Sequence, residues 1–212
     1  MTKVKVCGIT RLEDAELSIS LGAWALGFIL WPQSKRFVDP GVAAGIVRLV
    51  RRKVETVGVF VNQPLDEIAE RVDTLGITHV QLHGDEGPSF CSAVAQRTGA
   101  KVIKAVRIGH AADLRDLERY HTDFHLLDTS EAGLYGGTGK TWDWKLVANR
   151  RNKIPLILSG GLTSENVADG IAAVRPWGVD VASGVEASPG IKDPAKLEAF
   201  FAAMLVKTKD LR

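Results

Sequence analysis

Leu156-Ile157-Leu158-Ser159-Gly160-Gly161 is an apolar run that ends directly in a glycine turn. The arrangement returns in Val179-Asp180-Val181-Ala182-Ser183-Gly184. Glycine in such a turn lets backbone N–H groups approach a ligand closely, because no Cβ stands in the way. Two such turns, closing the last two strand–helix units, predict a phosphate cradle at the carboxyl end of a (β/α)8 barrel. We therefore expect a small phosphorylated substrate.

Outward from these turns, short β-branched runs alternate with helical patterns along the chain. Eight runs are expected to be strands: residues 3–7, 25–30, 56–61, 79–82, 101–106, 124–128, 156–159 and 179–183. Helical patterns between and after them include residues 65–75, 113–120 and 194–205. Eight repeats of strand then helix predict an α/β protein whose residues 1–212 form one TIM barrel domain. An open doubly wound sheet is the structural alternative, because it shares the same repetition.

The composition argues against several classes of binding partner, including nucleic acids and membranes. The chain has 212 residues, 45% of them hydrophobic, and a net charge of +2, so no basic footprint for nucleic acid or anionic membranes is present. No apolar run is long enough to span a membrane, and the first residues read as a strand rather than a secretion signal. The two cysteines, Cys7 and Cys91, do not suggest a disulfide framework. We expect a cytoplasmic protein.

Cys7 is the first candidate catalytic residue. It ends the first expected strand, and Thr10 and Glu13 form a capping box that would open the first helix just after it. A helix N-terminus favours the thiolate, the reactive form of cysteine. The alternative is a buried small apolar residue, as most free cysteines are.

Strand alternation gives Cys7 a neighbour. If its side chain faces the barrel interior, then Lys5 shares that face. A buried ammonium needs a carboxylate partner. Because the eighth strand adjoins the first in a closed barrel, Asp180 is the expected partner.

Asp128 is the second candidate. It ends the sixth expected strand, and the glycine-rich segment 129–141 that follows predicts a lid that excludes water. An acid and a thiol facing across one mouth would form an acid–base pair suited to isomerisation. The alternative is a turn-capping aspartate. Within the segment, Gly139-Lys140-Thr141 imitates a nucleotide P-loop, but Leu134 stands where that motif requires glycine.

Two further side chains could bind substrate. Arg36 follows the second strand, and its planar guanidinium suits a substrate carboxylate, although a solvated surface charge is the usual alternative. His83 ends the fourth strand and could polarise a substrate oxygen or serve as a structural histidine. His79 shares its strand face, but no third ligand is apparent, so no metal site is expected.

Seven segments together resemble the phosphoribosylanthranilate isomerase family of tryptophan biosynthesis. They are Lys5-Val6-Cys7-Gly8-Ile9-Thr10, Val57-Gly58-Val59-Phe60, Val80-Gln81-Leu82-His83-Gly84, Leu126-Leu127-Asp128, residues 136–144, Leu158-Ser159-Gly160-Gly161-Leu162, and residues 179–186, which run on through 188–193. The resemblance covers nearly the whole chain in order. It implies a (β/α)8 barrel that uses no metal or organic cofactor.

The implied reaction is the Amadori rearrangement of N-(5-phosphoribosyl)anthranilate to 1-(2-carboxyphenylamino)-1-deoxyribulose 5-phosphate. The resemblance implies that Cys7 is the general base, that Asp128 is the general acid and that Arg36 lies near the anthranilate carboxylate. It assigns the phosphate to Gly160, Gly161, Ser183 and Gly184. The chain departs from the family pattern at Lys35, where proline is frequent, and at Trp142, where phenylalanine is usual.

Two other functions remain open at this point. One is another phosphate-binding barrel, such as indole-glycerol-phosphate synthase. Such a synthase would need a lysine as its general acid at the position of Cys7. A catalytically silent barrel would bind a phosphorylated ligand without turnover. The sequence leaves the assembly open between a monomer and a homodimer.

Overall fold

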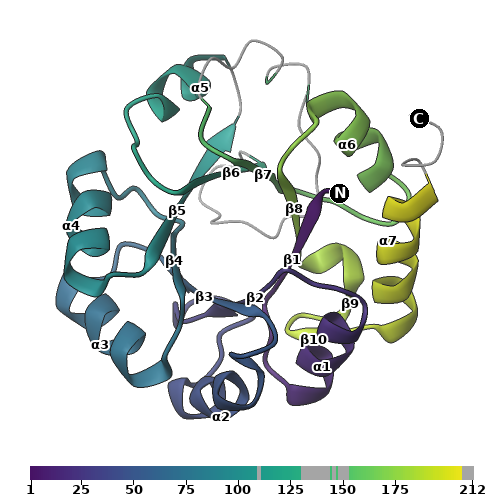
Figure 1. The fold of residues 1–212 in the computed structure, drawn as a ribbon, viewed down its shortest axis with the longest axis horizontal. Helices are drawn as coiled ribbons and strands as arrows, with labels where there is room; N and C mark the ends of the chain where they lie inside the picture. The colour runs from purple at the N-terminus through teal and green to yellow at the C-terminus, as the bar shows by residue number, and fades with distance from the viewer. Residues whose placement is uncertain (109–110, 130–143, 145–146, 148–152, 207–212) are drawn as a thin grey trace.

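The barrel predicted from the sequence is present and closed. The computed structural model describes residues 1–108, 111–129, 144, 147 and 153–206 (Figure 1). Its eight parallel strands pair in the order β1 to β8, and β1 also pairs with β8, which rules out an open sheet. The strands are β1 Lys3–Cys7, β2 Ala25–Ile29, β3 Glu55–Phe60, β4 His79–Leu82, β5 Lys101–Ile108, β6 Phe124–Thr129, β7 Leu156–Leu158 and β8 Gly178–Val181.

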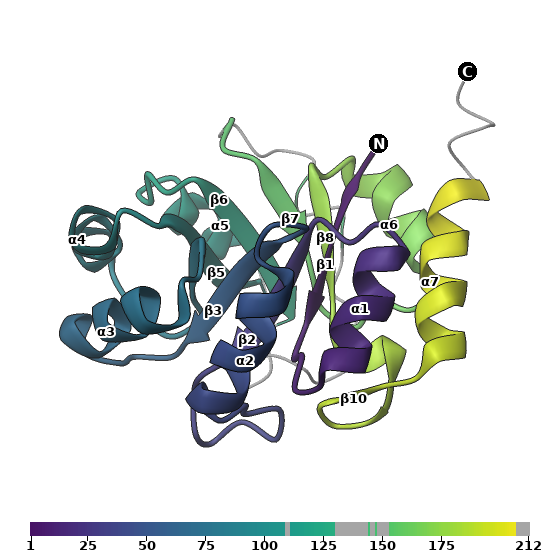
Figure 2. The same cartoon turned by 60° about the horizontal axis from the view of Figure 1, so that its bottom comes forward.

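Helices surround the barrel on its outside, as Figures 1 and 2 show. They are α1 Leu12–Ser20, α2 Pro40–Val50, α3 Leu65–Leu75, α4 Pro88–Thr98, α5 Ala111–Leu117, α6 Val167–Val174 and α7 Pro194–Val206. The helix expected over residues 113–120 therefore lies slightly earlier in the chain. No helix in the described ranges is both long and apolar enough to cross a bilayer.

The chain after β8 differs from the expected strand. Ser183 is not the end of β8 but begins a short 3-10 helix, η2 Ser183–Val185. An antiparallel pair that the sequence analysis did not predict follows, with β9 Glu186–Ser188 against β10 Ile191–Lys192. This pair lies beside α1, close to the carboxyl end of β1 (Figure 2).

Strand alternation separates two apolar layers. Val4 and Val6 of β1 belong to the large core between the sheet and the helices. Inside the barrel, a smaller cluster includes Ala25, Val57 and Leu126, from three different strands. Alternate residues of one strand therefore serve two different cores, as the pleat requires.

Aromatic rings close the amino-terminal end of the barrel. Trp24 and Trp177 meet edge to face with 4.7 Å between ring centroids, and Phe124 lies 4.9 Å from Trp177. His79, at the start of β4, meets Trp24 edge to face at 5.4 Å. Since apolar rings fill this end, the interior opens toward the carboxyl ends of the strands.

Candidate active site

Cys7 is the last residue of β1 and is 5% exposed. Its partner in register on β2 is Gly27. A Cβ at Gly27 would lie 2.8 Å from the Cys7 sulfur and 3.0 Å from Nζ of Lys5. Glycine at this position therefore leaves the space that the thiol and the ammonium share.

The ion pair predicted for Lys5 is confirmed. Lys5 is completely buried, and its Nζ lies 2.8 Å from Oδ1 of Asp180 on the neighbouring strand β8. The other carboxylate oxygen accepts a hydrogen bond from the Ser159 hydroxyl at 3.3 Å. Burial by itself would lower the pKa of Lys5, but Asp180 and Cys7 outweigh it and raise that pKa to about 12.

Burial, rather than a nearby helix N-terminus, has the largest effect on the Cys7 thiol. Burial raises the pKa of the Cys7 thiol, and the opposing charge of Lys5 does not fully offset it. The capping box is also absent. Helix α1 begins at Leu12 without a side-chain cap, and the Thr10 hydroxyl donates instead to the carbonyl oxygen of Gly190.

Asp128 and His83 come together at the same end of the barrel. Asp128 is a buried residue of β6, and its Oδ2 lies 3.2 Å from Nε2 of His83, which follows β4. The Gln81 amide nitrogen lies 2.8 Å from the other ring nitrogen, Nδ1. When that amide donates, Nδ1 is an acceptor and the ring proton sits on Nε2, which is near the carboxylate but makes no hydrogen bond with the described residues.

Arg36 is held by a carboxylate that the sequence analysis did not single out. Its Nε lies 2.9 Å from Oε1 of Glu186, and its Nη2 lies 2.8 Å from Oε2. Although burial opposes it, the hydrogen bonds and charges of Arg36 and Lys192 lower the pKa of Glu186. Among the described residues, Nη1 of this guanidinium has no hydrogen-bond partner.

Lys192 is the second residue that sequence reasoning missed. Its buried Nζ donates to the Cys7 carbonyl oxygen at 2.6 Å and lies 3.0 Å from Oε1 of Glu186. It also reaches the carbonyl oxygen of Ala182 at 3.3 Å. Lys192 thus ties the ends of β1 and β8 together. No local pattern indicates this role, because the contacts with Cys7 span the length of the chain.

The two glycine turns lie against each other. Gly160 and Gly161 have φ values of 90° and 63°, a region that side chains disfavour. A Cβ at Gly184 would overlap the carbonyl oxygen of Leu162, so the turn after β8 packs on the turn after β7. Among the described residues, the backbone amides of Gly160 and Gly161 donate to no protein acceptor. They are available to bind an anion.

These groups share the carboxyl end of the strands. The predicted lid after Thr129 and the P-loop imitation at 139–141 lie outside the described residues. Within the part of the chain that the structure describes, no three metal-binding side chains gather. Both cysteines are buried and free.

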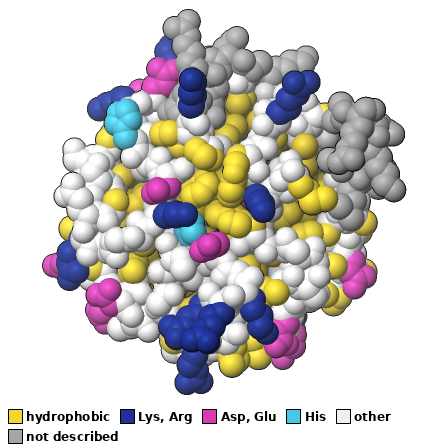
Figure 3. Space-filling model, viewed as in Figure 1, with side chains coloured by type: hydrophobic (Ala, Val, Ile, Leu, Met, Phe, Trp, Pro, Cys, Tyr) yellow, Lys and Arg dark blue, Asp and Glu magenta, His cyan; other side chains and the backbone are white. Residues whose placement is uncertain are grey.

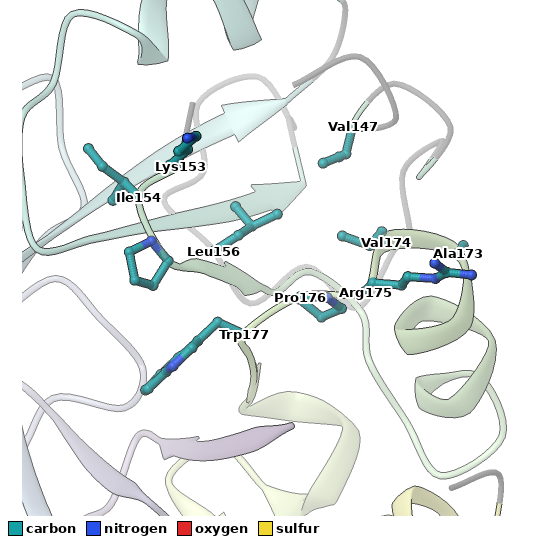
Figure 4. A pocket seen from close by; sticks show the side chains of 10 residues that line it. Val147, Lys153, Ile154, Leu156, Ala173, Val174, Arg175, Pro176 and Trp177 are labelled. Carbon is teal, nitrogen blue, oxygen red and sulfur yellow. The ribbon is translucent and has the colours of Figure 1, made fainter. Parts of the chain in front are cut away.

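A separate hollow lies at the other end of the barrel (Figure 4). It measures about 630 Å³ and is lined by the segment before β7 and the turn between α6 and β8, with Lys153, Arg175 and Trp177 among its residues. It lies at the amino ends of β7 and β8, away from Cys7 and Asp128. It is therefore distinct from the candidate site.

Comparisons with known proteins match nearly the whole chain. The family model for N-(5'phosphoribosyl)anthranilate (PRA) isomerase matches residues 4–203. N-(5'-phosphoribosyl)anthranilate isomerase of Pelobacter propionicus is 46% identical over 200 residues, covering 94% of each chain. The crystal structure of phosphoribosyl anthranilate isomerase from Thermotoga maritima is 43% identical, with a TM-score of 0.86 over 96% of this chain and 98% of that one.

A further solved structure shows a member with a ligand. It is phosphoribosyl anthranilate isomerase in complex with reduced 1-(o-carboxyphenylamino)-1-deoxyribulose 5-phosphate, 40% identical, with a TM-score of 0.83 over 96% of this chain and 98% of that one. With a family model that spans nearly the whole chain and relatives of this identity, the chain belongs to the N-(5'-phosphoribosyl)anthranilate isomerase family.

Proposed function

We propose that this protein catalyses the Amadori rearrangement of N-(5-phosphoribosyl)anthranilate to 1-(2-carboxyphenylamino)-1-deoxyribulose 5-phosphate in tryptophan biosynthesis. One observation carries the proposal beyond family membership. Cys7 and Asp128, the two candidate proton-transfer residues, are buried at the same end of the barrel as the two glycine turns. Active sites of (β/α)8 barrels are built at this end.

In the proposed mechanism, Asp128 donates a proton to the ribose ring oxygen, and the ring opens to a Schiff base. The electrons of the anthranilate nitrogen drive this opening. Cys7, as the thiolate, then removes the C2′ proton and becomes the thiol, which leaves an enolamine. The enolamine tautomerises to the ketone. Because burial raises the pKa of the Cys7 thiol, this step needs a group that favours its ionisation.

Binding is assigned to three places around the mouth. The free amides of Gly160 and Gly161, with the adjoining turn at Ser183 and Gly184, would hold the phosphate. Arg36 would receive the anthranilate carboxylate on its open side. His83 would contact the substrate oxygen on which Asp128 acts, since the two side chains are 3.2 Å apart.

The assembly and the compartment are further expectations. The relatives include monomers of dimeric phosphoribosylanthranilate isomerase from Thermotoga maritima. A homodimer is accordingly as consistent with the family as a monomer. Two free thiols fit the reducing cytoplasm.

The test measures turnover of phosphoribosylanthranilate by its fluorescence in wild type, Cys7→Ala and Asp128→Asn. Each substitution should lower kcat at least about a hundredfold while the circular dichroism spectrum stays native. Cys91→Ala, which changes the other buried cysteine, is the matched control and should keep kcat. Near-normal turnover in Cys7→Ala or Asp128→Asn would remove that residue from the mechanism. A wild type that binds substrate without converting it would identify a silent barrel.

A further inference from the structure

We propose that Lys5 is a positioning residue for Cys7: its buried ammonium, held by Asp180, is the positive charge that makes ionisation of the Cys7 thiol possible inside the barrel. The inference rests on the proposed role of Cys7 as the base. It assigns a function to a buried ion pair that the mechanism above does not use.

The geometry brings the ammonium to the sulfur. Lys5 and Cys7 are alternate residues of β1, so both side chains point into the barrel. The sulfur and Nζ both border the empty space over Gly27, where a Cβ would be 2.8 Å and 3.0 Å from them. Asp180 fixes the ammonium from the neighbouring strand at 2.8 Å, and Ser159 in turn fixes Asp180.

The other charges near Cys7 do not replace Lys5. Lys192 also favours the thiolate, but less than Lys5 does, and its Nζ is held by the Cys7 carbonyl oxygen and by Glu186. Glu186 also pairs with Arg36, the next cation along the mouth. Asp180 itself disfavours the thiolate, yet its effect is smaller than that of Lys5, whose Nζ borders the same space over Gly27 as the sulfur.

This arrangement has a physical reason. A buried thiolate without a countercharge would be costly, since burial penalises the charged form. An isolated buried ammonium would be equally costly, and Asp180 prevents that. Asp180 therefore offsets the cost of burying the Lys5 ammonium. Lys5 still favours the Cys7 thiolate more than Asp180 disfavours it.

The first experiment titrates the Cys7 thiolate by its ultraviolet absorbance in a Cys91→Ala background, so that Cys7 is the only thiol. Lys5→Met should raise the Cys7 pKa by about 1 to 3 units, the range for an adjacent opposite charge. The double variant Lys5→Met/Asp180→Asn leaves no unpaired buried charge. It therefore tests the inference even if Lys5→Met alone does not fold. It should raise the same pKa by a smaller amount, because a disfavouring carboxylate is removed with the ammonium.

The matched control is Lys104→Met/Glu86→Gln, which removes another buried lysine–carboxylate pair, one with 2.9 Å between its charged atoms. It should leave the Cys7 pKa unchanged. An unchanged Cys7 pKa in the folded Lys5→Met/Asp180→Asn variant, or an equal rise in the control, would overturn the inference.

The second experiment measures kcat/KM against pH in the same variants. The rising limb should move to higher pH by the same amount as the thiol pKa, so that the lost rate returns in alkaline buffer. A purely structural role would instead lower the rate at every pH, and that result would also overturn the inference. The two proposals fail separately. Activity in Cys7→Ala would refute the base assignment, whereas an inactive Cys7→Ala with an unshifted Lys5→Met profile would refute only the role of Lys5.

Discussion

The two ends of the barrel are built from different chemistry. At the carboxyl end, charged side chains are buried in pairs: Lys5 with Asp180, Lys104 with Glu86, and Lys192 with Glu186. At the amino end, aromatic rings pack on one another, and Figure 3, which views this end, shows apolar side chains gathered at its centre. The protein thus buries charged pairs around one end of the barrel and apolar rings at the other.

The difference separates function from stability. A buried ion pair contributes little net stability, because desolvation offsets the attraction between its charges. Buried aromatic rings contribute a large apolar area and favourable ring contacts. We infer that the amino end closes and stabilises the barrel, while the carboxyl end accepts the cost of buried charge in order to control protons and bind anions. Three changes test this division.

The largest expected effect is on stability, at the amino end. Phe124→Ala would remove a ring that contacts Trp24, Trp177 and His79. It should lower the free energy of unfolding by about 3 kcal/mol. Urea denaturation measures this loss, and Leu49→Ala on the exposed face of α2 is the control that should cost little. A large fall in kcat of the folded Phe124→Ala protein would contradict the assignment of the amino end to stability alone.

A smaller effect, on binding, is expected at the carboxyl end. Arg36→Ala should raise KM about tenfold or more and change kcat less, because the guanidinium is assigned to binding the substrate carboxylate. Steady-state kinetics give both constants. Lys35→Ala, at the exposed neighbouring residue, is the control and should leave KM near the wild-type value. An unchanged KM in Arg36→Ala would remove Arg36 from the site and leave it as the structural partner of Glu186.

The smallest effect concerns pH and the amino end again. Burial lowers the pKa of His79, and Glu55, 3.6 Å away, offsets this only in part. As the pH falls, His79 is therefore protonated in the unfolded chain, near pH 6.5, before it is protonated in the folded chain. Because the unfolded state then binds more protons, the free energy of unfolding should fall as the pH drops below about 6.5. Urea midpoints at successive pH values should show a shallower fall in His79→Gln. The exposed His121→Gln should keep the wild-type slope, and an identical slope in His79→Gln would contradict the assignment.

Several features of the site were predictable because they follow from periodic patterns. The eight strands, the inward face of Lys5 and its pairing with Asp180 all follow from alternation in a closed barrel. Expected strand ends lie within two residues of the observed ends, the usual uncertainty of such boundaries. Thr10 was misjudged for a different reason. Its hydroxyl found a partner 180 residues away, and no local pattern can indicate such a contact.

By itself, the sequence determined the barrel and many of the residues at its mouth, because hydrophobic periodicity and glycine turns are local properties. The tertiary structure alone decided the electrostatics of that mouth. It placed Glu186 on Arg36 and Lys192 on the Cys7 carbonyl oxygen, and it buried the Cys7 thiol so that its pKa rises. These outcomes depend on which charges become neighbours after the chain closes on itself. Both the desolvation of a group and its Coulomb energy are set by three-dimensional distance, which spacing along the chain does not determine.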